Sequence, residues 1–173
     1  QGYKDSVYKL FAEDEKVVRD NPKLSPAEVE KNIEQIKKSL EMFESLFSNE
    51  NFENLKEKKY FRLSLKAVQA SLLIQLYRQE PILQMPHRLL QALVNLDEHM
   101  TQWRYRHALM AHRMLGRKIG TGGSSGHDYL KSATEQHKIF SDFFNLTTFL
   151  IPRSMIPTLP EEIKNKMRFS DCL

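Results

Sequence analysis

The feature that most constrains this chain is an apolar stripe along residues 87–115. Its members recur at alternating intervals of four and three residues, in the order Leu89, Leu93, Leu96, Met100, Trp103, His107, Met110 and Met114. This spacing places all of these side chains on one face of an α-helix. The pattern therefore predicts one long helix from about His87 to Leu115, with a histidine inside a face typical of a buried core.

Helical patterns also fill the N-terminal part of the chain. The motif Ser25-Pro26-Ala27-Glu28 combines an N-cap serine, a proline at the first helical position and a glutamate at the third. This is a capping box, and apolar residues at helical spacing follow it to about residue 47. A similar pattern over residues 7–18 ends at Asn21-Pro22. Together these segments predict an antiparallel helical hairpin within residues 1–60.

The middle of the chain carries further start and stop signals. Ser64 can cap a helix that continues through Tyr77, and the polar residues 48–59 before it read as a break between helices. Pro81 and Pro86 bracket what we expect to be a short connection into the long helix.

After the long helix, the pattern predicts a helix over residues 128–150, closed by Pro152, and a short one over 161–167. No segment alternates as a strand does, and no repeat occurs. We expect an all-α helical bundle, divided into the hairpin of residues 1–60 and a helical region of residues 61–173.

Composition indicates which environment the protein is suited to. The chain has 173 residues, a mean hydropathy of −0.53 and no apolar run of the roughly 20 residues that span a bilayer. The single cysteine, Cys172, allows no disulfide within the chain, which favours a reducing compartment and a cytoplasmic protein. Because the first residue is Gln1 and not methionine, we expect a processed chain or a fragment.

Glycine and positive charge gather in one segment. Five of the six glycines lie between Gly116 and Gly126. The window from His99 to His127 contains no Asp or Glu, and its basic residues are Arg104, Arg106, Arg113, Arg117 and Lys118. The net charge of +4 and the pI near 9.1 therefore come from this window.

His107 can be interpreted in three ways. A buried histidine that hydrogen-bonds within a core is the commonest case. A single histidine among apolar neighbours is also how many haem pockets supply an axial ligand, with arginines nearby for the propionates. Zinc is disfavoured, because His107 and His112 are five residues apart and point in different directions on a helix, and no CxxC or HExxH motif occurs.

The loop Gly120-Thr121-Gly122-Gly123-Ser124-Ser125-Gly126 lacks the lysine and the preceding strand of a phosphate-binding P-loop. It reads either as a flexible linker or as a ligand-contacting lid, since small residues allow close backbone approach and the hydroxyls offer polar contacts. Nucleic-acid binding by the basic window is disfavoured because its arginines scatter around the helix axis, and we expect neither nucleic acid nor membrane as a partner.

Several motifs together resemble the tryptophan 2,3-dioxygenase family. They are Trp103-Arg104-Tyr105-Arg106-His107, His112-Arg113-Met114-Leu115-Gly116, the glycine loop itself, and Phe144-Asn145-Leu146-Thr147-Thr148-Phe149-Leu150-Ile151-Pro152-Arg153. Weaker similarity begins near Arg62-Leu63-Ser64, so the resemblance covers roughly Arg62 to Pro157. The residues before it, 7–47, resemble a variable insertion of the family.

The resemblance implies a tetrameric haem b enzyme that adds O2 to the indole of L-tryptophan to give N-formylkynurenine. On this mapping His107 is the axial ligand of the haem iron and Trp103 packs at the haem. Thr121 contacts the substrate ammonium group, with Gly122, Gly123 and Ser124 beside it in the substrate-binding loop.

The chain departs from the family pattern in two ways. His127 stands where the family usually has tyrosine. The family's N-terminal half is missing, and with it the distal histidine and the arginine that binds the substrate carboxylate, so no catalytic residue is assigned here. We expect activity only with that half bound as a companion chain. The alternative is a non-enzymatic helical module that binds haem or a partner.

Overall fold

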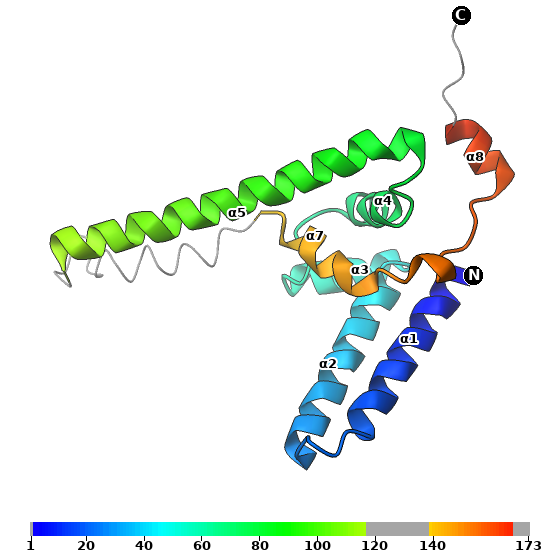
Figure 1. Ribbon diagram of the computed structural model, residues 1–173, viewed down its shortest axis with the longest axis horizontal. Helices are drawn as coiled ribbons and strands as arrows, with labels where there is room; N and C mark the ends of the chain where they lie inside the picture. Colours follow the sequence, from blue (N-terminus) through cyan, green and yellow to red (C-terminus); the bar gives the residue numbers. More distant parts are fainter. Residues whose placement is uncertain (1, 117–138, 168–173) are drawn as a thin grey trace, which may run out of the picture.

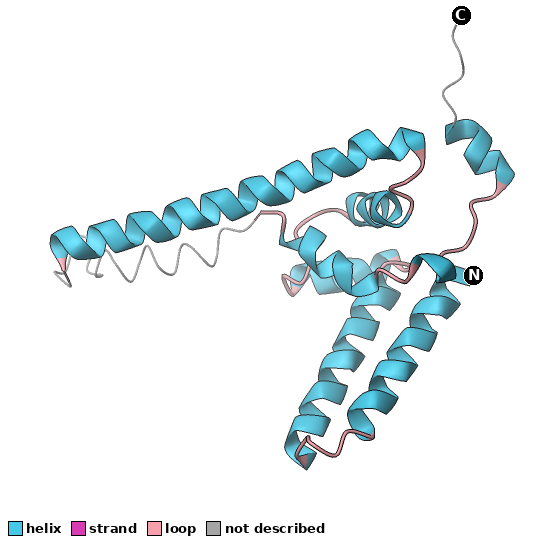
Figure 2. Cartoon of the chain, viewed as in Figure 1, coloured by secondary structure: helices cyan, strands magenta, loops and turns pink. Residues whose placement is uncertain are grey.

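The computed structural model describes residues 2–116 and 139–167, apart from the side chain of Leu115, and every regular element in these ranges is helical (Figure 2). In chain order the elements are α1 (Gly2–Arg19), α2 (Pro26–Ser45), α3 (Asn49–Glu57), α4 (Leu65–Leu76), α5 (Pro81–Leu115), α7 (Ser141–Asn145), the 3-10 helices η1 (Leu146–Phe149) and η2 (Arg153–Met155), and α8 (Glu161–Met167). The expected all-α class is confirmed.

Helices α1 and α2 form the predicted hairpin, which projects from one side of the molecule (Figure 1). The capping box at its turn is complete: the Ser25 hydroxyl accepts from the backbone N–H of Glu28, and the Glu28 carboxylate accepts from the backbone N–H of Ser25. That backbone hydrogen bond is the main reason why the pKa of Glu28 is lowered. Local sequence therefore fixes where α2 begins.

One hydrophobic core joins the hairpin to the helices that follow it. The buried members of this core are Val7, Phe11, Phe43, Leu46, Phe52, Leu55, Phe61, Val68, Leu72, Leu90, Phe143, Leu146, Phe149 and Ile151. Phe43 of α2 is fully buried, with its ring 5.4 Å from that of Phe149 in η1 and 5.8 Å from that of Tyr3 in α1. The Tyr3 hydroxyl also donates to the Phe149 carbonyl oxygen at 2.7 Å.

The predicted break over residues 48–59 is wrong, because helix α3 occupies most of it. Ser48 caps α3 by accepting from the backbone N–H of Asn51, and Phe52 and Leu55 bury their side chains on one face. The Phe52 ring stacks on that of Phe61, with centroids 4.6 Å apart. Two apolar residues at helical spacing are enough to hold a nine-residue helix that is otherwise polar.

The expected connection between Pro81 and Pro86 is also wrong, since α5 already begins at Pro81. Proline fits the first helical position because its missing N–H needs no partner there. Pro86 lies inside the helix, where it removes the hydrogen bond to the Ile82 carbonyl and crowds that group, a cost that this long helix tolerates. The helix therefore continues through both prolines.

The single helix predicted over residues 128–150 is wrong within its described part, residues 139–150. The backbone N–H groups of Ile139 and Phe140 donate to the carboxylate of Asp97 in α5, at 3.2 and 3.0 Å. These bonds hold the backbone out of a helical path, so α7 begins at Ser141 and the 3-10 turn η1 follows it. Residues 128–138 lie outside the described residues.

A second buried carboxylate, that of Asp142, orders the entry into α4. Its Oδ2 accepts from the backbone N–H groups of Arg62 and Leu63 at 2.9 and 2.8 Å. Asp97 and Asp142 are 4% and 1% exposed, and each joins segments distant in sequence. Within residues 2–116 and 139–167 no helix is both long and apolar enough to cross a bilayer.

Candidate functional site

The apolar stripe of α5 is exposed where the sequence predicted a buried core face. Trp103 is 59% exposed and Met114 75%, and Leu89, Leu96 and Met110 are each more than half exposed. Figure 1 shows the reason, since α5 extends well past the other described helices and only its first half lies over them. A stripe of this size that no described element covers is typical of a binding surface.

His107 lies in the middle of this exposed face and is half-buried. Its imidazole stacks on the Trp103 indole one turn earlier, with ring centroids 5.4 Å apart and an angle of 7° between the planes. It makes no hydrogen bond with any other described residue. The imidazole of His107 therefore lies among apolar side chains without a hydrogen-bond partner among the described residues. Its orientation is held by the stacked Trp103 ring.

The basic side chains of α5 lie on more than one side of this face. Arg106 and Arg113 are seven residues apart and share a side of the helix, whereas Arg104 lies opposite them. Arg106 and Arg113 are exposed, and Arg104 is half-buried. The remaining basic residues of this window, Arg117 and Lys118, lie outside the described residues.

The predicted substrate loop also lies outside the described residues, which include neither Thr121, Gly122, Gly123 nor Ser124. The structure fixes the two points between which this segment runs. Gly116 ends α5 with a φ of 60°, a left-handed conformation that suits glycine. The chain resumes at Ile139, whose N–H is bound to Asp97 on α5.

Asp97 is the positioning residue that sequence reasoning missed. It holds the return of the chain from the glycine segment against α5, ten residues before His107. The sequence contains a feature that could have identified Asp97. It is an acidic residue beside the apolar Leu93, Val94 and Leu96 of a long predicted helix. A carboxylate in that setting is expected to have backbone or charged partners.

The described residues contain no group of three or more His, Cys, Asp or Glu side chains arranged to hold a metal ion. What the α5 face offers is a single imidazole, a flat aromatic neighbour and apolar surface. Such a face could hold a flat apolar group and supply it with one imidazole nitrogen as a ligand.

The chain is similar to known proteins over nearly its whole length. A family profile described as "Tryptophan 2,3-dioxygenase" matches residues 1–150. The curated protein named tryptophan 2,3-dioxygenase from Bdellovibrio bacteriovorus is 56% identical over 167 residues, which is 96% of this chain and 46% of that protein.

Two more distant relatives carry the same name. The protein from Alteromonas mediterranea is 45% identical and covers 98% of this chain and 47% of its own length. The protein from Dictyostelium discoideum is 40% identical, with 97% and 42% covered. The chain therefore spans a little less than half the length of the curated relatives that it matches.

Proposed function

Because the chain belongs to the tryptophan 2,3-dioxygenase family, we propose that it is the C-terminal part of a haem-dependent oxidoreductase acting on L-tryptophan. The reaction inserts both atoms of O2 across the C2–C3 bond of the indole and gives N-formylkynurenine, which opens the kynurenine route of tryptophan breakdown. The observation that carries the proposal is His107, a single imidazole at the centre of an exposed apolar helix face.

The residues of the α5 face fit haem b as cofactor. His107 would hold the iron through its available ring nitrogen, and the stacked Trp103 would support the imidazole and pack on the macrocycle. Arginines of the same helix can pair with the propionates. When bound, the haem supplies the iron at which O2 is activated.

The chain's own contribution to substrate binding is the segment after α5. Thr121 would contact the ammonium group of tryptophan, and Gly122, Gly123 and Ser124 would bring backbone and hydroxyl groups close to it. The hydrogen bonds from Ile139 and Phe140 to Asp97 support this proposal, because they bring the far end of the segment back to α5.

The distal side of the haem and the group that binds the substrate carboxylate would come from the N-terminal half of the enzyme as a companion chain. The exposed side chains of α5 support this, since they offer an apolar surface for such a partner. We further propose a homotetramer in the cytoplasm, with residues 1–60 as a structural or interface hairpin and residues 61–173 as the haem-binding region.

The test is to prepare the chain together with the N-terminal half of a relative such as the Bdellovibrio protein and to load the complex with haemin. We expect a Soret band, and formation of N-formylkynurenine from tryptophan, ascorbate and O2. The His107→Ala variant should lose both signals, because no second imidazole shares its face of α5.

His99→Ala is the matched control, since His99 is an exposed histidine of the same helix whose ring bonds only the carbonyl oxygen of Asn95. It should keep the spectrum and the turnover. An unchanged Soret band in His107→Ala would remove this residue as ligand. Haem binding without product in the full complex would favour the non-enzymatic module instead.

A further inference from the structure

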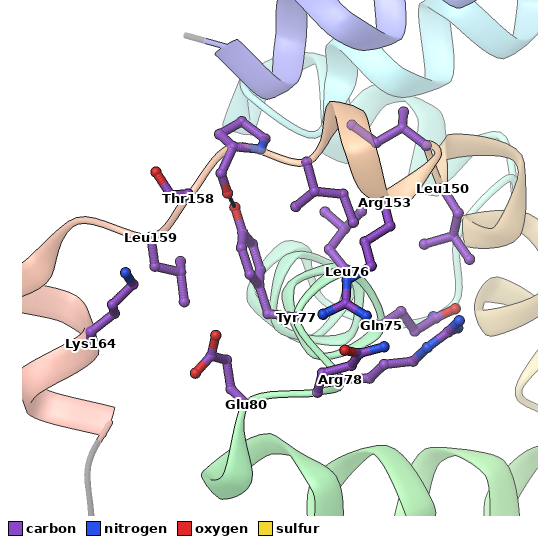
Figure 3. A pocket seen from close by; sticks show the side chains of 14 residues that line it. Gln75, Leu76, Tyr77, Arg78, Glu80, Leu150, Arg153, Thr158, Leu159 and Lys164 are labelled. Atoms are coloured by element: carbon purple, nitrogen blue, oxygen red, sulfur yellow. Dashed lines mark hydrogen bonds between the residues drawn. The ribbon is translucent and has the colours of Figure 1, made fainter.

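A cavity at the opposite end of the molecule from the exposed half of α5 has no place in the proposed reaction. It has a volume of about 430 Å³ and lies between the end of α4, the start of α5, the segment of residues 150–159 and α8 (Figure 3). The Tyr77 hydroxyl donates to the Pro157 carbonyl oxygen at 2.8 Å and so holds the two walls together. Burial raises the pKa of Tyr77, which keeps this hydroxyl protonated as a donor.

Two guanidinium groups face one side of the cavity. Figure 3 shows Arg153 and Arg78 directed toward the same space beside Gln75, on one side of the Tyr77 ring. Neither arginine pairs with a carboxylate of any described residue, whereas Lys164 at the other side is paired with Glu161 at 2.9 Å. Glu80 is the one acidic side chain among the described residues that line the cavity. The arginine side is therefore cationic and available to an anion.

Gln75 gives a second and independent indication. It is only 8% exposed, yet its side-chain amide makes no hydrogen bond with another described residue and lines the cavity. The amide borders the cavity, so its hydrogen-bonding groups are available to a ligand bound there. A ligand oxygen held by the two arginines would supply the acceptor that the Gln75 amide lacks.

The rest of the wall selects the kind of anion. The cavity has an apolar side, lined by Leu76, Leu150, Ile156 and Leu159. A fully hydrated inorganic anion makes no favourable contact with this apolar surface. The carboxylate of Glu80 also disfavours a compact dianion. We propose that this cavity is a binding site for a small organic carboxylate with an apolar body, held by Arg153, Arg78 and Gln75.

The site is distinct from the haem face and does not depend on the function proposed above. It is tested on the full 173-residue chain by calorimetric titration with isocaproate as the probe, and with isocaproamide and inorganic phosphate as comparisons. We expect isocaproate to bind at least tenfold more tightly than the amide, which has the same shape without the charge, and more tightly than phosphate.

Substitutions at Arg153 and Gln75 test whether these residues bind isocaproate. Arg153→Gln should weaken isocaproate binding at least tenfold, Arg153→Lys should weaken it less, and Gln75→Leu should weaken it severalfold. Lys31→Gln removes an exposed positive charge of α2 remote from the cavity and should leave the affinity unchanged. Circular dichroism would establish that each variant is folded.

Three results would overturn the proposal. Equal affinity for isocaproate and isocaproamide would mean that the charge is not recognised. Phosphate binding as tight as isocaproate binding would identify a general anion site. An Arg153→Gln variant that folds normally and binds as tightly as the Lys31→Gln control would remove Arg153 from the site.

Discussion

Asp97 joins distant parts of the chain through backbone groups and not through another side chain. Its two carboxylate oxygens accept from the N–H groups of Ile139 and Phe140, and the residue is 4% exposed. The position at which the chain rejoins α5 after the glycine segment therefore depends on one carboxylate.

Asp97→Ala should leave both N–H groups without their acceptor, at positions that are partly buried. An unpaired polar group costs about 1–3 kcal/mol when it is fully buried. Because Ile139 is 55% exposed, we expect the free energy of unfolding to fall by about 1–3 kcal/mol in total. Urea denaturation followed by circular dichroism measures this loss. Glu98→Gln, at the exposed neighbouring position, is the control, and equal stability of the two variants would contradict the assigned role of Asp97.

His87 should make the stability of the chain depend on pH. Burial, and to a lesser extent the charge of Arg78, lower the pKa of His87 below its usual 6.5. As the pH falls through 6.5, the unfolded chain takes up a proton at this residue before the folded chain does. The free energy of unfolding should therefore decrease between pH 6.5 and the lower folded pKa, and be unaffected by His87 above that range.

Thermal melting of the chain and of His87→Gln between pH 7.5 and 5 tests this expectation. The variant should show a smaller decrease in Tm over the range, because it has no imidazole to protonate. Melting curves whose Tm values fall in parallel would refute it.

At the scale of elements, Phe43 is one of the buried residues that join the α1–α2 hairpin to the rest of the chain. Replacing a fully buried phenylalanine by alanine costs about 3–5 kcal/mol, so Phe43→Ala should be strongly destabilised. Because the core is continuous from Val7 to Ile151, urea should still unfold the variant in one transition. Phe47→Ala, which removes a half-exposed ring, should cost less, and separate melting of the hairpin would contradict the shared core.

Two helices that were predicted from sequence have starts that are set locally. Ser25 and Ser64 cap their helices through backbone groups three residues later, and Ser25 adds the full capping box with Glu28. A local cap was not sufficient at Ser48, because the polar sequence of α3 conceals its two buried residues. The start of α5 and the start of α7 could not be found in this way. Pro81 is equally compatible with a turn and with a first helical residue, and the break at Ile139 depends on Asp97, which is 42 residues away.

The helix face of the candidate site was predictable and its exposure was not. The spacing around His107 identifies the helix face, and several motifs together indicate the family. Periodicity cannot distinguish a face that is buried by the same chain from one that is covered by something else. The cavity beside Tyr77 could not be predicted from the sequence, because Arg78 and Arg153 are distant in the chain and are brought together only by the fold.

At the scale of the whole molecule, the exposed stripe of α5 should make the isolated chain bind a hydrophobic dye. We expect strong fluorescence with anilinonaphthalene sulfonate, and a decrease of more than half when the N-terminal half of a relative is added, because the proposed partner would cover the stripe. The double variant Leu96→Ser and Met110→Ser, at two exposed positions, should reduce the signal of the isolated chain. A signal that the added partner leaves unchanged would argue against this surface as its binding site.

The length of α5 has one more consequence. Its first half holds Leu90 in the core and Asp97 in its hydrogen bonds, whereas Met110 and Met114 near the other end are exposed. Amide hydrogens should therefore exchange with deuterium slowly around Leu90 to Asp97 and progressively faster toward Gly116. If the proposed haem site forms on this face, loading the complex of the two halves with haem should remove this gradient. The exchange rate of each amide along α5 would then report how far the site has been assembled.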